Sequence, residues 1–197
     1  GGKHAHDSTD IQEFMIVPAG FSTFSEAIRA GAEVYQTLLR VLREKGLNTG
    51  VGDEGGFAPS LNSNQEAIEL VIEAIQIAGY DPGVNFFVAI DAAASELYDP
   101  GSSTYDLQRE KRKITAEEFV GIYQSWINKY PMISIEDGLA EDDWDDWNTM
   151  NKKLGGSVQL VGDDLLTTNP TRIQKGIDGN SANSVLIKPN QIGTLTE

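Results

Sequence analysis

Hydrophobic positions along the chain follow two spacings that alternate from one end to the other. Short apolar runs typical of buried strands occur five times: Ile11–Val17, Val84–Ile90, Met132–Ile135, Val158–Gly162 and Ser184–Ile187. Between most of these runs, apolar residues recur at the three- and four-residue spacing of amphipathic helices. Strands that alternate with helices favour a parallel sheet. We therefore expect an α/β fold.

Capping boxes, in which Ser or Thr precedes Glu by three residues, mark three helix starts. The pairs are Thr23 with Glu26, Ser63 with Glu66, and Thr115 with Glu118. The first helix is expected to end at Gly46 and the second at Gly79. The apolar side of the first helix comprises Ile28, Val34, Tyr35, Leu38, Leu39 and Leu42. Two further helices are predicted at Asp142–Leu154 and Pro170–Ile177.

Two segments depart from the alternation of strands and helices. Gly50–Pro59 joins the first two helices and places Asp53 and Glu54 among four glycines, which allow a close approach to a ligand. A flexible linker is the alternative, but Phe57 at its exit favours a functional loop. The stretch Leu97–Lys113 is polar and rich in turn residues. We expect it to be an excursion on the surface.

Four predicted strands run into a charged residue, and these residues are Asp91, Glu136, Asp163 and Lys188. The carboxyl ends of parallel strands gather at one mouth, where barrel enzymes carry their catalytic groups. Three carboxylates offer the oxygen ligands that Mg²⁺ prefers, and a lysine beside them can act as a base. Singly, each residue also fits a helix cap, a turn or a salt bridge. Jointly, they predict a metal site with a base.

Composition narrows the class of protein. The 197 residues are 40% hydrophobic and 23% charged, which is typical of a soluble globular domain. A formal net charge of -15 argues against nucleic acid as a partner. No apolar run approaches the roughly 20 residues of a transmembrane helix. The first residues lack the pattern of a signal peptide, and cysteine is absent, so a cytoplasmic location is expected.

Seven segments, in order, carry a resemblance to the enolase family over essentially the whole chain. They are Gly1–Ala5, Gln12–Ile16, Gly52–Gly56, Ile90–Glu96, Ser134–Asp137, Gly162–Leu165 and Lys188–Thr194. The resemblance implies a partial TIM-like barrel with about five of eight strands, one of them antiparallel in the family. Residues 1–197 would then be a fragment of the C-terminal barrel domain, without the N-terminal α+β domain and the last barrel strands. Gly138 stands where many relatives have proline.

The resemblance implies a hydro-lyase, phosphopyruvate hydratase, that dehydrates 2-phosphoglycerate to phosphoenolpyruvate in glycolysis and gluconeogenesis with Mg²⁺. The full-length protein would carry this activity, and the fragment alone is expected to be inactive. By matching motif, the implied metal ligands are Asp91, Glu136 and Asp163. Lys188 is implied as the base that removes a proton, and Glu54 as the acid that assists the departing hydroxide.

The remaining implied residues contact the substrate. Gln12 and Glu13 are expected near the leaving hydroxyl, and His4 on a mobile substrate loop. Glu136, Asp163 and Lys188 are expected to contact the substrate as well. Two alternatives stay open: another acid-sugar dehydratase of the same superfamily, and a plasminogen-binding role at the cell surface or after secretion. The small phosphorylated substrate and a homo-oligomeric full-length protein are further expectations.

Overall fold

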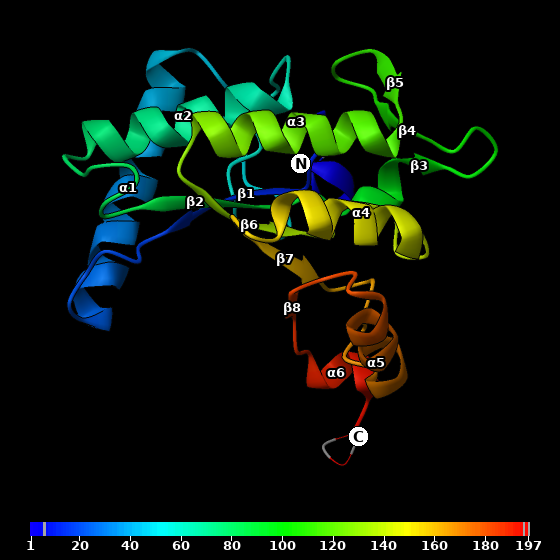
Figure 1. Ribbon diagram of the computed structural model, residues 1–197. Helices are drawn as coiled ribbons and strands as arrows, with labels where there is room; N and C mark the ends of the chain where they lie inside the picture. The colour runs from blue at the N-terminus through cyan, green and yellow to red at the C-terminus, as the bar shows by residue number, and fades with distance from the viewer. Residues whose placement is uncertain (6, 195, 197) are drawn as a thin grey trace. The chain divides into compact units, whose positions relative to one another are not determined.

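The computed structural model describes residues 1–5, 7–194 and 196, and the chain divides into two compact units (Figure 1). The first unit comprises Gly1–Ile90, Gln108–Lys111 and Tyr130–Met132. The second comprises Asp91–Leu107, Arg112–Lys129 and Ile133–Glu197. Among the described residues, no helix has the length and apolar character that crossing a membrane requires.

The first unit confirms the strand and the two helices predicted for the first third of the chain. Its elements are η1 (Gly2–His4), β1 (Glu13–Val17), α1 (Phe24–Glu44), α2 (Asn64–Ile77) and β2 (Phe87–Asp91), the last residue of β2 lying in the second unit. The Thr23 hydroxyl accepts the backbone N–H of Glu26 at 3.2 Å, as the capping-box spacing predicts. Ser63 caps α2 through Glu66 in the same way.

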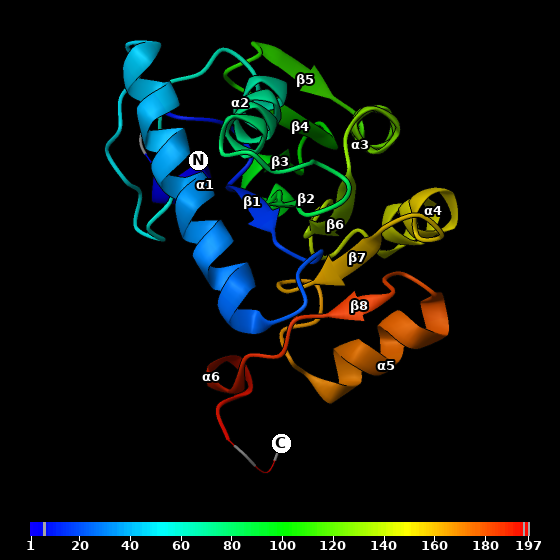
Figure 2. The same ribbon diagram turned by 90° about the vertical axis from the view of Figure 1, so that its left-hand side faces the viewer.

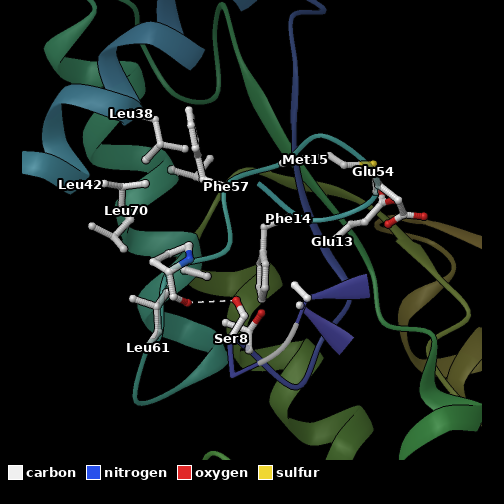
Figure 3. Close-up of a pocket in the computed structure, with 18 of the residues that line it drawn as sticks. Ser8, Glu13, Phe14, Met15, Leu38, Leu42, Glu54, Phe57, Leu61 and Leu70 are labelled. Atoms are coloured by element: carbon white, nitrogen blue, oxygen red, sulfur yellow. Dashed lines mark hydrogen bonds between the residues drawn. The ribbon is translucent and has the colours of Figure 1, made fainter. Parts of the chain in front are cut away.

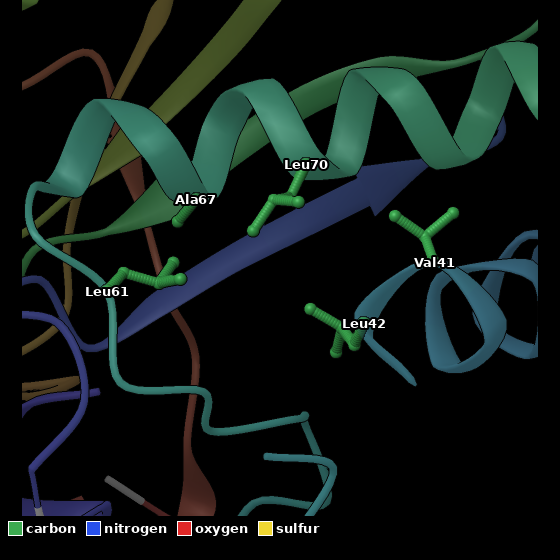
Figure 4. Packing of buried hydrophobic residues seen from close by; sticks show 5 residues of the cluster. All are labelled: Val41, Leu42, Leu61, Ala67 and Leu70. Atoms are coloured by element: carbon green, nitrogen blue, oxygen red, sulfur yellow. The ribbon is translucent and has the colours of Figure 1, made fainter. Parts of the chain in front are cut away.

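A hydrophobic cluster joins α1, α2 and β1 within the first unit. Its buried members are Val41, Leu42, Leu61, Ala67 and Leu70 (Figure 4). Phe14 of β1 and Phe57 of the glycine-rich loop pack against this cluster. Burying a side chain of leucine size contributes about 1.5–3 kcal/mol. The cluster therefore fixes the strand that begins at Glu13 and the loop that contains Glu54 to one body.

The second unit contains the parallel strands. Its elements are η2 (Ala94–Leu97), β3 (Tyr98–Asp99), β4 (Thr104–Leu107), β5 (Arg112–Ile114), α3 (Ala116–Lys129), β6 (Met132–Glu136, whose first residue belongs to the first unit), α4 (Trp144–Leu154), β7 (Gln159–Gly162), α5 (Pro170–Gly179), β8 (Ser184–Val185) and α6 (Pro189–Ile192). Strand β7 pairs in parallel with β6, where Ile135 lies opposite Leu160, and with β8, where Gly162 lies opposite Val185 (Figure 2). The α/β prediction is confirmed.

The expected surface excursion at Leu97–Lys113 is wrong in part. Strands β3, β4 and β5 form a three-stranded antiparallel sheet within this stretch. Tyr105 and Leu107 on β4 are completely or almost completely buried, at 0% and 1% exposure. The Tyr105 ring packs edge-on against Phe119 of α3, with the ring centroids 5.3 Å apart. Alternate residues of β4 therefore pack inward, although the surrounding residues are polar.

Two other expectations need correction. On α1, Val34 and Leu42 are buried as predicted, whereas Ile28 is 56% exposed and Tyr35 is exposed as well. The last predicted strand ends at Val185, two residues early. Beyond it, the N–H of Leu186 donates to the Gly162 carbonyl at 3.1 Å, and the N–H of Lys188 donates to the Thr168 hydroxyl at 2.8 Å.

Candidate active site

A pocket in the first unit gathers the four site residues predicted from the first third of the chain. Its volume is about 270 Å³, and His4, Gln12, Glu13 and Glu54 are among its lining residues. Figure 3 places Glu13 and Glu54 toward one end of the pocket and the leucines of α1 and α2 toward the other. Polar groups thus converge at one end of an otherwise apolar pocket, which is the usual character of a small-molecule site.

A close backbone approach positions His4 beside Glu54. The N–H of Asp53 donates to the His4 carbonyl at 3.1 Å. A Cβ atom on Gly52 would lie 2.8 Å from that same carbonyl oxygen, so only glycine fits this place without displacement. The His4 ring then lies between two acids, with Nδ1 3.7 Å from Asp53 Oδ2 and Nε2 3.9 Å from Glu54 Oε1.

The loop that carries Glu54 is held at several points rather than being a free linker. The Tyr35 hydroxyl donates to the Gly55 carbonyl at 3.0 Å, and the Tyr35 ring stacks on Phe57 with centroids 4.3 Å apart. The Ser8 hydroxyl donates to the Pro59 carbonyl at 3.0 Å, drawn as a dashed line in Figure 3. These contacts favour the functional interpretation of the glycine-rich segment over the linker.

In the second unit, Lys188 and Asp163 are in direct contact. Lys188 Nζ donates to Asp163 Oδ2 at 2.5 Å, and Gln191 Nε2 donates to Oδ1 of the same carboxylate at 2.6 Å. Asp163 is 8% exposed. The hydrogen bond to Asp163 raises the pKa of Lys188, and burial opposes this with a smaller effect. The sequence prediction that these two strand-end residues meet is confirmed.

Asp137, directly after β6, lies at the centre of the same strand ends. Its Oδ1 accepts the N–H of Asp163 at 3.0 Å and its Oδ2 accepts the N–H of Asp164 at 2.7 Å. Burial raises the pKa of Asp137 to about 7, although the two backbone N–H groups act in the opposite direction. The structure therefore places a buried carboxylate here that the sequence analysis did not single out.

The carboxylates of Asp137, Asp163 and Asp164 form a group that can hold a metal ion. One oxygen from each lies within 4.8 Å of the others. Hard divalent cations such as Mg²⁺ prefer carboxylate oxygens, so the oxygen-only character of this group suits the ion that the sequence predicts. Of the predicted ligands, only Asp163 belongs to this group.

The two other predicted ligands lie at the ends of neighbouring strands. Asp91 is the last residue of β2, is 7% exposed, and accepts the N–H of Ala93 at 3.0 Å. Glu136 ends β6, and its carbonyl accepts the N–H of Ala92 at 2.9 Å. The main chain thus brings these strand ends side by side in the second unit. Their role as metal ligands stays a prediction.

The chain as a whole matches one family model. That model is described as enolase, C-terminal TIM barrel domain, and it matches residues 1–197. The chain belongs to this family. The enolase barrel domain seen here is α/β with a mostly parallel sheet. Membership indicates an enzyme of the enolase superfamily.

Sequence reasoning missed three groups around Asp163 in the enolase barrel domain. Asp137, Asp164 and Gln191 each contact or adjoin Asp163, yet only the first acid of each acidic pair was singled out. The sequence did carry a signal for the two acids, because each of Glu136 and Asp163 is followed directly by a second acid. A second acid at a strand end is a candidate for holding the first in place.

Proposed function

We propose that the full-length protein containing this chain dehydrates 2-phosphoglycerate to phosphoenolpyruvate with Mg²⁺, as a hydro-lyase. The observation that carries the proposal is the contact between Lys188 and Asp163 at the carboxyl ends of parallel strands. A lysine beside a cation-binding carboxylate is the pairing that removal of a weakly acidic proton requires. The family match supports the same class of chemistry.

The reaction places opposite demands on two residues. Neutral Lys188 takes the proton from the carbon next to the substrate carboxylate, which leaves that carboxylate with additional negative charge. Bound Mg²⁺ would supply positive charge to stabilise this developing anion. Glu54 gives a proton to the hydroxyl that leaves the neighbouring carbon, so that a water molecule departs as the double bond forms. Lys188 therefore serves proton removal, and Glu54 serves the departure of hydroxide.

Asp163 controls when Lys188 can act. In this structure its carboxylate accepts hydrogen bonds from both Lys188 and Gln191, and the bond from Lys188 raises the pKa of the lysine and so favours the charged ammonium. A cation held by Asp163 would engage its oxygens and so weaken the hydrogen bond to the ammonium. We propose Asp91 and Glu136 as further ligands, on the strength of their positions at the ends of β2 and β6.

The residues of the first-unit pocket support enolase over an acid-sugar dehydratase. Glu13 and Glu54 both line the pocket, and His4 Nε2 lies 3.9 Å from Glu54. We propose that Glu13, Gln12 and His4 hold the substrate around the leaving hydroxyl while Glu54 supplies the proton. A paired set of acids with a histidine suits departure of a hydroxyl next to a phosphate-bearing carbon.

A turnover assay of the full-length protein tests this function. We expect phosphoenolpyruvate from 2-phosphoglycerate, with activity lost on chelation of Mg²⁺ and no turnover of sugar acids. Lys188→Ala should lower kcat by about 10²–10⁴-fold, the usual contribution of a general base. Lys175→Ala is the matched control, because Lys175, on α5, lies over the ring of Trp144, which begins α4. Preferred turnover of a sugar acid would identify a different member of the superfamily.

A further inference from the structure

One side chain, that of Asp137, accepts hydrogen bonds from the main chain that follows β7. Strand β7 ends at Gly162, and the next two N–H groups, of Asp163 and Asp164, do not continue its pairing with β6. They point instead to the two oxygens of the Asp137 carboxylate, at 3.0 and 2.7 Å. Asp137 therefore holds two consecutive residues, Asp163 and Asp164, directly after the end of β7. The first of them, Asp163, is the predicted metal ligand.

Asp137 is itself fixed to two neighbouring chain segments, residues 161–164 and the start of η2 at Ala94. Its N–H donates to the Val161 carbonyl at 3.0 Å, and its carbonyl accepts the N–H of Ala94 at 3.0 Å. Its φ angle is +42°, a left-handed conformation that is uncommon for a residue other than glycine. Such a conformation persists only where the surroundings impose it. Four hydrogen bonds with two segments impose it here.

Aromatic side chains hold the segment that follows, which comprises residues 137–140. The Tyr123 hydroxyl donates to the Gly138 carbonyl at 3.0 Å. The Tyr105 hydroxyl accepts the N–H of Ala140 at 3.0 Å. Trp147 Nε1 donates to the carbonyls of Leu139 and Ala140 at 3.2 and 3.1 Å. All three aromatic residues are 0% exposed, so the segment rests on a rigid buried support.

We propose that Asp137 is a positioning residue that sets the place of the Asp163 carboxylate through the main chain, and that it does not serve as a ligand in the group it forms with Asp163 and Asp164. Each of its oxygens already accepts a backbone N–H, and the residue is 4% exposed. The inference rests on the proposed function for the role of Asp163 as a cation ligand. Groups that orient a metal ligand typically change metal affinity by 10–100-fold when they are removed.

Mg²⁺ titration of the full-length protein without substrate tests the proposal. Asp137→Asn keeps the shape of the side chain but turns an NH₂ group toward one of the two N–H donors. We expect a 10–100-fold rise in the Kd for Mg²⁺. Asp143→Asn is the matched control, since Asp143 accepts the N–H of Asp146 at the start of α4 and asparagine can do the same. Its Kd should stay within twofold of the wild-type value.

Two results would overturn the proposal. A Kd for Asp137→Asn within twofold of the wild-type value would show that Asp137 has no positioning role. A rise in the Kd for Mg²⁺ beyond about 10³-fold would show that Asp137 is itself a ligand. Amide hydrogen exchange of the wild-type protein decides the matter if the variant does not fold. The N–H groups of Asp163 and Asp164 should exchange slowly. Rapid, unprotected exchange would contradict their hydrogen bonds to the Asp137 carboxylate. Neither readout involves 2-phosphoglycerate, so the proposed function can fail independently.

Discussion

Lys188 Nζ and Asp163 Oδ2 lie 2.5 Å apart, although 25 residues separate them in the sequence. The contact joins the end of β7 to the start of α6, with α5 and β8 between them. The charge state of Lys188 therefore depends on Asp163, because the hydrogen bond to the carboxylate raises the pKa of the lysine. The two groups that we assign to proton removal and cation binding form one electrostatic unit.

Removal of the second donor to Asp163 should strengthen Mg²⁺ binding. Gln191→Leu takes away the hydrogen bond from Gln191 Nε2 to Asp163 Oδ1, which now competes for that oxygen. A hydrogen bond of this kind contributes about 1 kcal/mol net, so the Kd for Mg²⁺ should fall about threefold to tenfold. Calorimetric titration without substrate measures it. Gln174→Leu on α5, whose amide bonds Asp178, is the control. Weaker Mg²⁺ binding by the Gln191 variant would mean that Gln191 helps to hold the ion.

Removal of the Tyr105 hydroxyl should destabilise the protein through the buried N–H of Ala140. That N–H donates to the hydroxyl at 3.0 Å, and phenylalanine would leave it without its partner. An unsatisfied buried donor costs about 1–3 kcal/mol, which denaturant unfolding of Tyr105→Phe measures. Tyr98→Phe, on the ring next to Tyr105, should change stability by less than about 0.5 kcal/mol. Equal effects of the two variants would contradict the assigned bond.

The buried side-chain amide of Asn64, in the first unit, allows a test in which protein stability is measured as a function of pH. Asn64 is 1% exposed, its Oδ1 accepts the N–H groups of Asp10 and Ile11, and its Nδ2 donates to the carboxylates of Asp10 and Glu110. Asn64→Asp replaces that donor by a carboxylate oxygen. At pH 7 we expect a loss of at least about 2 kcal/mol, because like charges then face each other in a buried place.

The sign of the pH effect follows from Asp10. Burial already raises its pKa above 3.8 in the folded protein, and a second carboxylate at position 64 would raise it further. The folded variant then binds protons more tightly than the unfolded chain, so its stability falls as pH rises through that range. Unfolding curves of the variant and the wild type should therefore converge as the pH falls from 7 toward about 4. A difference that stays constant with pH would contradict this account.

The close approach at Gly52 makes the position of His4 testable. A Cβ atom at Gly52 would lie 2.8 Å from the His4 carbonyl oxygen, so Gly52→Ala should displace His4 from Glu54. A displacement of about 1 Å near a catalytic group lowers the rate about 10²-fold. Steady-state kinetics should show this loss in kcat with unchanged Mg²⁺ affinity. A Cβ at Gly56 would meet no atom within 4 Å, so Gly56→Ala should leave kcat close to the wild-type value.

Signals between residues close in sequence predicted the helices and strands. Features that depend on hydrogen bonds between distant residues could not be predicted in this way. The capping boxes at Thr23 and Ser63 placed two helices, because a cap depends on residues three apart. The strand-end rule brought Asp163 and Lys188 together, because parallel strands share a direction. Tyr105 was assigned to a surface excursion, since its partner Ala140 lies 35 residues away and nothing local indicates it.

The position of Asp137 also depended on distant partners. The sequence showed an acid after Glu136, but its contacts with the backbone of Asp163 and Asp164 arise only when β6 and β7 pair. The left-handed φ angle at Asp137 is likewise set by its neighbours rather than by its own residue type. Residues that position a ligand are therefore harder to predict than the ligands, which stand at recognisable places along strands.

Exchange of the substrate proton with deuterated water tests the central claim, the separate roles of Lys188 and Glu54, most directly. The full-length protein is incubated with 2-phosphoglycerate and Mg²⁺, and loss of the proton next to the carboxylate is followed by NMR beside phosphoenolpyruvate formation. Lys188→Ala should abolish both exchange and product. Glu54→Gln should abolish product but retain exchange, because the base is intact. Exchange that persists in Lys188→Ala, or undiminished product formation in Glu54→Gln, would contradict the account.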